Sequence, residues 1–327
     1  MSEILLSNEI IIYLFTQIVL FVLLFIAFYF SVFIIKNWDY NKTTSYQYKL
    51  EKKSYLIILI IFFTLIVKIF LMPYFSYSID NLSHIIPGAM CAAGVIKANN
   101  YGEILLGLKL LILFFIGIWL IINSLDLKEK TYPYTKQKFA FYIFIFILII
   151  LETTLDILYL SNISTKEPVM CCSVIFGSNA VGNKIPFNLS IFMLVGLFYL
   201  TFLLTIFSNI QKQKFINFII NTFFLYISYY AMTYFFSTYI YQLPTHQCPF
   251  CMLQKEYFFI GYFIWTSLFL GTFFGIASFV VPIFIKKDLD YSFKYSILFN
   301  SIFVCLCTFY LVKYYLINGV FLYSNLV

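Results

Sequence analysis

The sequence contains no arginine, and only 11% of its 327 residues are charged. Soluble domains carry about 25% charged residues, so this shortage excludes an ordinary water-soluble fold. The apolar stretches also lack the strict alternation of apolar and polar residues that a membrane-spanning barrel needs. The composition therefore favours helices that are dissolved in lipid.

Hydrophobic residues make up 62% of the chain. A helix needs about 20 apolar residues to cross a bilayer, and eight segments meet this length: 9–35, 55–74, 104–123, 140–160, 188–208, 215–241, 257–283 and 295–317. We predict an all-α, polytopic protein in a lipid bilayer, with about eight transmembrane helices. No linker divides it, so residues 1–327 are predicted to form a single transmembrane helical domain.

Lysine provides every positive side chain, 21 in total. Fourteen lysines follow the first, third, fifth and seventh segments, and five lie in the opposite loops and the tail. The positive-inside rule places the richer set in the cytoplasm and both termini on the non-cytoplasmic side. The net charge of +7 is thus a topology signal, and no nucleic-acid partner is predicted.

Cysteine is concentrated in the predicted outer loops, at about 75–103, 161–187 and 242–256. These loops hold five of the seven cysteines, both histidines and a methionine beside a cysteine in each: His84, Met90, Cys91, Met170, Cys171, Cys172, His246, Cys248, Cys251 and Met252. Cys305 and Cys307 lie two residues apart in the last span, so they face different directions and are interpreted as packing residues.

Cys248 and Cys251 form a C-x-x-C pair between the sixth and seventh segments. Pro249 is compatible with a first helical turn, which would place both thiols at the start of the seventh helix, where backbone amides stabilise a thiolate. Lys255 would then lie one turn further along the same face and add positive charge, although Glu256 beside it offsets this.

Two outer loops, 84–96 and 168–177, are too apolar to be solvated, and we expect them to fold back onto the helix ends. They would enclose a partly dry site for the thiols. The alternative interpretation is that the two loops are short interfacial caps in which the cysteines only fill space and have no chemical role.

A C-x-x-C followed four residues later by a basic residue, at the outer start of a transmembrane helix, resembles the DsbB-type quinone-linked disulfide generators. Vitamin K epoxide reductases use a similar arrangement. The resemblance covers about a dozen residues, and it implies that Cys248 and Cys251 exchange disulfides with a soluble, thioredoxin-like periplasmic carrier. It also implies a second cysteine pair and places Lys255 beside a quinone.

The chain departs from that family in two ways. The family has four spans with its second pair in a later loop, and its basic residue is normally arginine, whose planar fork lysine lacks. Here the candidates for the second pair come earlier, as Cys91, Cys171 and Cys172. Adjacent cysteines close a strained ring, so one of them could bridge to Cys91 while the other attacks the C-x-x-C disulfide.

Metal binding is the rival hypothesis. Cys, Met and His together favour copper(I), and all ten loop residues named above are candidate ligands, with a metal carrier as partner. Zinc ranks lower, because a second compact cysteine pair is missing. A third hypothesis is a non-catalytic membrane subunit of a larger complex. A relay needs one further cysteine near the C-x-x-C pair, whereas a metal site needs three soft ligands at one point.

Charged residues within the spans are a second signal. Lys68, Lys109, Glu152 and Asp156 all fall in the predicted outer half of the bilayer, where they could meet. For Lys68, Glu152 and Asp156 a proton path or substrate cavity competes with a structural ion pair. Lys109 is expected to snorkel to the interface. Gly271-x-x-x-Gly275 predicts close packing between helices.

The leading prediction is a membrane thiol-disulfide oxidoreductase that passes electrons from a periplasmic dithiol to a lipid quinone. Cys248 and Cys251 would be the redox pair. An outer compartment that oxidises thiols suggests a multi-pass protein of a bacterial inner membrane.

Overall fold

The computed structural model describes residues 3–40, 44–129, 132–165, 167–169, 189–285 and 287–322. Within these ranges the chain is helical and contains no strand. Eight of the described helices are long and apolar enough to cross a membrane. The predicted all-helical, multi-pass class is confirmed, and the environment of these helices is a lipid bilayer. The side on which the termini lie stays a prediction.

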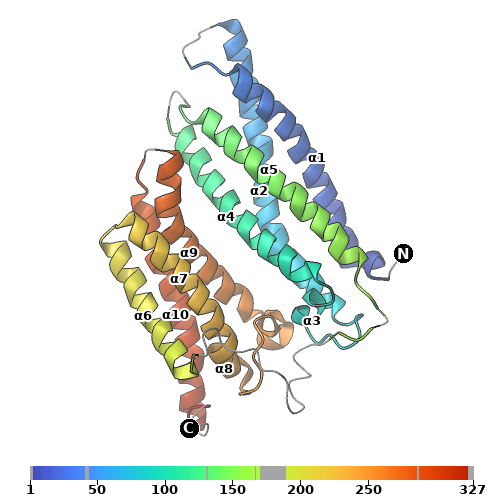
Figure 1. The fold of residues 1–327 in the computed structure, drawn as a ribbon, viewed down its shortest axis with the longest axis vertical. Coiled ribbons are helices and arrows are strands. Elements are labelled where there is room, and N and C mark those ends of the chain that lie inside the picture. The colour runs from blue at the N-terminus through green and yellow to red at the C-terminus, as the bar shows by residue number, and fades with distance from the viewer. Residues whose placement is uncertain are drawn as a thin grey trace. The chain divides into compact units, whose positions relative to one another are not determined.

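The first compact unit, unit 1, comprises Met1–Pro87 and Ile96–Glu167. Its long helices are α1 (Asn8–Asn37), α2 (Ser45–Leu82), α4 (Tyr101–Leu127) and α5 (Thr135–Ser161) (Figure 1). Helix α1 packs against α2 and α5, and α4 packs against α5. These four helices surround the buried charges described below.

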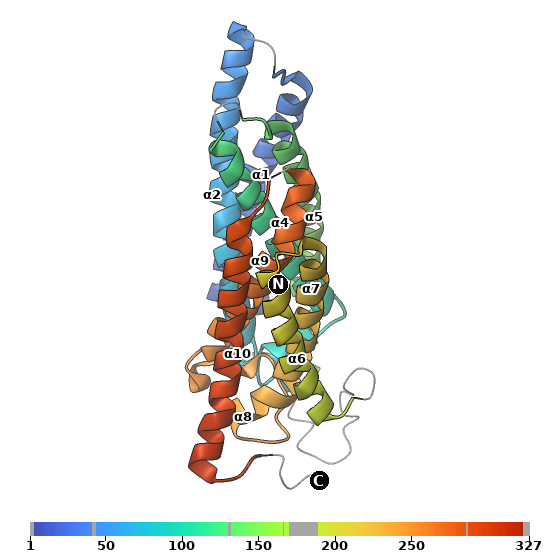
Figure 2. The same ribbon diagram turned by 90° about the vertical axis from the view of Figure 1, so that its left-hand side faces the viewer.

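The second compact unit, unit 2, comprises Gly88–Val95 and Pro168–Val327. Its helices are α6 (Ile191–Ile210), α7 (Lys214–Ala231), a π-helical segment (Met232–Phe236), α8 (Ser237–Tyr241), α9 (Ile260–Phe284) and α10 (Asp290–Asn318). The π segment joins α7 and α8 into one span. Figure 2 shows α6, α7 and α10 running alongside one another. The short helix α3 (Ala92–Ile96) starts in this unit.

The chain divides into these two compact units. The prediction of one transmembrane domain over 1–327 concerns how the units combine, so it stays a prediction.

The outer surface of the helices is apolar. Phe15 on α1 is 68% exposed and Phe263 on α9 is 69% exposed. Exposed aromatic rings of this kind would be unfavourable in water but are stable against lipid chains. Polar side chains such as those of Gln17 and Asn221 are instead buried between the helices, because a bilayer offers them no hydrogen-bond partner.

Polar packing is dense between α7, α9 and α10. A Cβ atom on Gly271 would lie 2.1 Å from Asn300 Oδ1, and one on Gly275 would lie 2.2 Å from Asn221 Cγ. Asn300 in turn donates to Asn221 Oδ1 at 3.1 Å. The two glycines therefore make room for asparagines of the neighbouring helices, which confirms the predicted close packing.

Candidate functional site

The C-x-x-C pair lies on an irregular segment between α8 and α9. Cys251 begins a 3-10 turn that ends at Leu253, and a second turn runs from Lys255 to Tyr257. Gln254 between them is extended. Phe258 and Phe259 then both adopt left-handed backbone angles, with φ of 54° and 55°, which an α-helix cannot include.

The seventh long helix therefore begins at Ile260, and the expectation that the thiols form its first turn was wrong. The sequence does not predict the left-handed conformation of Phe258 and Phe259, because aromatic residues rarely adopt it. The thiols receive no stabilisation from the start of that helix. Lys255 is exposed on the second 3-10 turn and is not one α-helical turn from Cys251.

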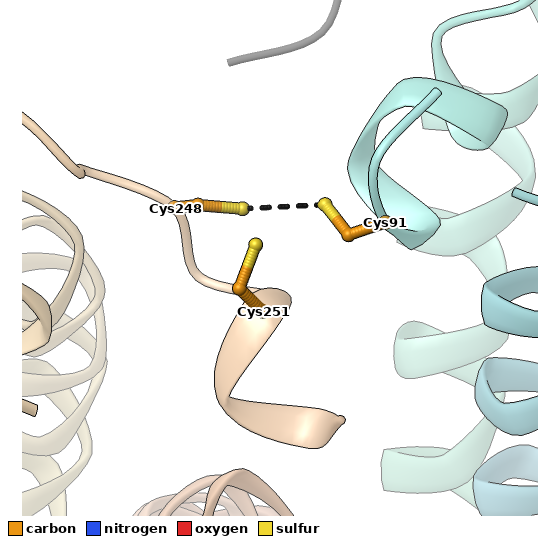
Figure 3. Close-up of side chains that lie close together, drawn as sticks. All are labelled: Cys91, Cys248 and Cys251. Carbon is orange, nitrogen blue, oxygen red and sulfur yellow. Dashed lines mark hydrogen bonds between the residues drawn. The ribbon is translucent and has the colours of Figure 1, made fainter. Parts of the chain in front are cut away.

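Three cysteines converge in unit 2. Cys91 precedes α3, and its Sγ lies 3.7 Å from Cys248 Sγ, within reach of a sulfur hydrogen bond. The sulfurs of Cys91, Cys248 and Cys251 all lie within 4.8 Å of one another. Figure 3 shows the three side chains pointing toward a common centre, with Cys91 coming from the opposite side of that centre to the C-x-x-C segment. We call these residues the thiol site.

The thiol site is buried among apolar side chains. Cys91 and Cys248 have no exposed surface, and Cys251 is 5% exposed. The surrounding core includes Met252 and Tyr241 from unit 2. The expectation of a partly dry thiol site agrees with this burial.

Tyr241 fixes the shape of the C-x-x-C loop. Its hydroxyl donates to the carbonyl oxygen of Cys248 at 2.6 Å and accepts from the backbone N–H of Met252 at 2.9 Å. One phenol thus connects the two ends of the loop that carries both thiols. The indole N–H of Trp265 on α9 donates to the carbonyl of Pro249 at 3.1 Å. Sequence reasoning missed both residues, since neither stands out among 28 tyrosines and three tryptophans.

The loop with Cys91 is tied to the same segment. The amide of Gln254 donates to the carbonyl of Met90 at 3.2 Å. Gly88, three residues before Cys91, has φ of +79°, and a Cβ there would lie 2.5 Å from the carbonyl oxygen of Val169. Glycine is required for this conformation and this close approach.

Three rings pack together next to the C-x-x-C segment. The ring of Tyr241 lies 4.2 Å from that of His246 and 4.7 Å from that of Tyr257. Burial raises the pKa of Tyr257, with the neighbouring Cys251 as a smaller cause. Its phenol therefore stays protonated at neutral pH and remains a hydrogen-bond donor.

The other residues predicted as metal ligands are not among the three side chains that converge. His246 is half-buried against Tyr241 and is not one of the three converging ligands. The side chain of Met252 is buried, whereas that of Met90 is 58% exposed. His84 is exposed in unit 1. Met170, Cys171 and Cys172 lie outside the described residues.

The side chains of Cys305 and Cys307 face different directions, as the sequence predicts. Cys305 is exposed on α10 and Cys307 is fully buried. The thiol of Cys307 donates to Met232 Sδ at 3.8 Å. Both positions fit packing residues, with Cys307 in the core and Cys305 on the outer surface.

Three thiols at these distances support two kinds of chemistry. Disulfide exchange needs an attacking sulfur next to a disulfide sulfur, and Cys91 occupies that place beside Cys248. A metal ion with bonds of about 2.3 Å to three sulfurs in a plane would hold them about 4.0 Å apart. The 3.7 Å contact and the 4.8 Å limit are compatible with this arrangement.

A second polar centre lies inside unit 1. Lys68 Nζ lies 2.7 Å from Glu152 Oε2, and Lys109 Nζ lies 2.6 Å from Glu152 Oε1 and 2.9 Å from Asp156 Oδ2. The two lysines are each only 5% exposed. The predicted meeting of these charges is confirmed, but Lys109 does not snorkel to the interface.

Two uncharged residues of α1 complete this centre. Tyr13 donates to Asp156 Oδ2 at 2.9 Å, and Gln17 accepts from Lys68 Nζ at 2.9 Å. We call the whole set the ionic ring: Tyr13, Gln17, Lys68, Lys109, Glu152 and Asp156. Sequence reasoning missed Tyr13 and Gln17, although a phenol and an amide four residues apart in an apolar span were a usable signal.

A separate buried ion pair joins α4 and α5. Lys138 Nζ lies 2.6 Å from Asp126 Oδ2, and both side chains have no exposed surface. Lys138 is one of the fourteen lysines that the positive-inside rule places in cytoplasmic loops, but it lies in the first turn of α5 and is buried. A lysine at a span end can turn inward where a carboxylate meets it.

Comparisons with protein-family models, with curated proteins and with solved structures find no match to this chain. The assignment of function therefore depends on the chemistry of the residues.

Proposed function

We propose that the protein is a membrane thiol-disulfide oxidoreductase that moves electrons from a dithiol partner to a lipid quinone. The observation that supports this most directly is the third cysteine. Cys91 comes from a part of the chain more than 150 residues before the C-x-x-C pair, yet its sulfur lies 3.7 Å from that of Cys248. A lone C-x-x-C pair offers no such partner for exchange.

In the first step the partner is oxidised. A thiolate of the partner attacks a sulfur of the Cys248–Cys251 disulfide, the S–S bond breaks, and a mixed disulfide forms. The second thiolate of the partner then breaks the mixed disulfide. The partner leaves as a disulfide, and Cys248 and Cys251 are left as a dithiol that has gained two electrons and two protons.

Cys91 allows the disulfide to change position within the thiol site. Its thiolate attacks Cys248 Sγ, the bond between Cys248 and Cys251 breaks, and a Cys91–Cys248 disulfide forms while Cys251 leaves as a thiolate. No electrons are gained or lost in this isomerisation. Sulfurs within 4.8 Å of one another can make the exchange with small side-chain rotations.

The last step returns the site to its oxidised form. Two electrons and two protons pass to a lipid quinone, which becomes a quinol, and the S–S bond forms again. The resemblance to DsbB-type proteins assigns the cation beside the quinone to Lys255, and Cys171 and Cys172 remain candidates for further relay residues. On this proposal the partner is a soluble thioredoxin-like protein of the periplasm, and the membrane is a bacterial inner membrane.

Thiol trapping in membrane vesicles tests the proposal. When a quinone is supplied, alkylation should show Cys248 and Cys251 becoming oxidised, and Cys251→Ser should abolish this. Cys305→Ser is the matched control, because Cys305 is exposed on α10 and should leave the oxidation unchanged. Thiols that stay reduced in the presence of quinone would count against an oxidoreductase.

A soft-metal site is the second candidate, and the convergence of three thiols favours it. Copper(I) prefers such ligands, and the spacing of the sulfurs is compatible with a planar three-sulfur site. A protein that purifies with one copper per chain, and loses it in Cys91→Ser, would support binding or transport of copper by the same residues. Copper retained in that variant would exclude this site.

A further inference from the structure

In the ionic ring of unit 1, the two carboxylate oxygens of Asp156 differ in their hydrogen bonds. Asp156 Oδ2 accepts from Tyr13 at 2.9 Å, from Lys109 at 2.9 Å and from Gln17 at 3.2 Å. Asp156 Oδ1 has no hydrogen-bond partner among the described residues, although the side chain is only 2% exposed. A buried, bare carboxylate oxygen of this kind is unusual, because nearly all buried polar atoms are paired.

The other buried ion pair of unit 1 provides a contrast. Asp126 Oδ2 accepts from Lys138 at 2.6 Å, and Asp126 Oδ1 accepts from the backbone N–H of Tyr134 at 2.9 Å. Both oxygens of Asp126 are therefore partnered. Burial and a lysine neighbour are common to the two aspartates, so these two features alone do not leave an aspartate oxygen bare. Within the ionic ring, Glu152 Oε2 also has no hydrogen-bond partner among the described residues, although Lys68 Nζ lies 2.7 Å away.

A continuous chain of titratable groups leads to Asp156. It runs from Lys68 to Glu152 over 2.7 Å, from Glu152 to Lys109 over 2.6 Å, and from Lys109 to Asp156 over 2.9 Å. The two Lys109 contacts are hydrogen bonds, and the Lys68–Glu152 ion pair has a hydrogen-bonding distance, so small rotations would let a proton move along all three.

This chain of groups borders a small cavity of about 20 Å³, whose lining includes Lys68, Glu152 and Lys109 but not Asp156. This volume holds about one water molecule.

The two lysines of the ring have different numbers of partners. Lys109 Nζ donates to Tyr13, Glu152 and Asp156, so its three N–H bonds are all used. Lys68 Nζ contacts only Gln17 and Glu152 in the described part of the chain. The third N–H bond of Lys68 is therefore available to a water in the cavity that Lys68 lines.

We propose that the ionic ring is a proton-binding site within the bilayer. A proton from water is taken up in a relay: Lys68 passes one of its protons to Glu152 and regains one from water. Glu152 passes its proton to Lys109 as Lys109 gives one of its own to Asp156, which holds it. In each transfer an N–H or O–H bond breaks on the donor and one forms on the acceptor. With all four charged groups ionised the ring has no net charge, and the bound proton raises its charge to +1.

The groups that face this proton belong to all four long helices of unit 1. Tyr13 comes from α1, Lys68 from α2, Lys109 from α4, and Glu152 from α5, which also carries Asp156. Tyr159 on α5 is a further buried titratable group whose charge interacts with that of Asp156. The inference does not depend on the chemistry of the thiol site.

Infrared difference spectroscopy of the full-length protein in lipid nanodiscs tests this inference. As the pH is lowered, a carbonyl band of a buried carboxylic acid should appear, and it should shift when the solvent is D₂O. Asp156→Asn should remove this band, because the amide cannot take up the proton. Asp126→Asn is the matched control and should leave the band unchanged.

Two results would overturn the proposal. One is a wild-type spectrum without a carboxylic acid band that responds to pH and to D₂O, which requires no variant to fold. The other is a folded Asp156→Asn protein that keeps the band. Lys68→Met gives a further readout: the band should persist but exchange its proton more slowly, since the lysine with an N–H bond open to water in the cavity is missing.

Discussion

The two units bury reactive groups of different kinds, although the helices of both are surrounded by lipid. Unit 1 has charged groups at its centre, with two lysines and two carboxylates that contact one another. Unit 2 has three thiols set in an apolar core, and its buried contacts between α7 and α10 include neutral asparagine and serine side chains. The charged centre depends on exact pairing, whereas the thiol site depends on the shape of a loop.

The difference matters because lipid penalises the two kinds of group unequally. A charged side chain at the centre of a bilayer costs roughly 3 kcal/mol or more unless it is paired. A thiol behaves as a small apolar side chain and can be buried without a partner of opposite charge. Removing one member should therefore affect folding in unit 1 and chemistry in unit 2.

The largest expected effect is that of Lys109→Met. This change leaves Glu152 and Asp156 buried with Lys68 as the remaining cation, and it should lower the free energy of unfolding by about 3–5 kcal/mol. Lys255→Met, at an exposed site, should change it by less than about 0.5 kcal/mol. Denaturant unfolding in detergent measures both, and equal effects would contradict the importance of pairing.

A smaller effect is expected where helices of unit 2 meet. Gly275→Ala brings a Cβ within 2.2 Å of Asn221 Cγ and should destabilise the protein by about 1–3 kcal/mol. Gly196→Ala on α6 meets nothing within 4 Å and should be neutral or stabilise the helix by about 0.5–1 kcal/mol. The same unfolding measurement compares the two, and a loss of stability in Gly196→Ala would show that general crowding is the cause.

Tyr241→Phe tests whether the reactivity of the thiols depends on the shape of the C-x-x-C loop, because the change leaves all three cysteines in place. The change leaves the carbonyl of Cys248 and the N–H of Met252 without the hydroxyl that connects them, at a cost of about 1–3 kcal/mol. All three cysteines are still present, but the looser loop should make Cys248 and Cys251 react faster with an alkylating reagent. Tyr257→Phe is the control, and equal alkylation rates in both variants would show that the bridge does not shape the site.

The smallest effect is expected at the lipid surface. Cys305→Ala removes an exposed thiol of α10 and should change stability by less than about 0.5 kcal/mol. Cys307→Ala leaves a cavity beside Met232 in the core and should cost more, about 1 kcal/mol. Thermal unfolding of the two variants distinguishes them, and a reversed order would place Cys305 inside the bundle.

The sequence predicted the spans well, because hydrophobic length is a local property. Seven of the eight predicted spans begin within about five residues of the observed helices, which is the precision that composition allows. The exception of interest is α2, which was predicted over 55–74 and runs from Ser45 to Leu82. Its polar ends continue the helix beyond the apolar stretch.

The sites were predictable only in part. The concentration of cysteine in three loops pointed to Cys91, Cys248 and Cys251, but no rule of spacing selects Cys91 as the partner of Cys248. The segment around Cys251 was predicted as a helix start, and the left-handed Phe258 and Phe259 prevent it. Such conformations are imposed by tertiary contacts and have no local signal.

The sequence by itself determined that this chain is a helical membrane protein, because each span is long and apolar regardless of its neighbours. It also identified Lys68, Glu152 and Asp156 as charges within the spans that need partners, since lipid provides none. Only the tertiary structure decided that Lys109 turns inward to Glu152 and Asp156, and that Cys91 meets the C-x-x-C pair. These contacts join residues far apart in the chain, so they depend on how helices pack and not on any local pattern.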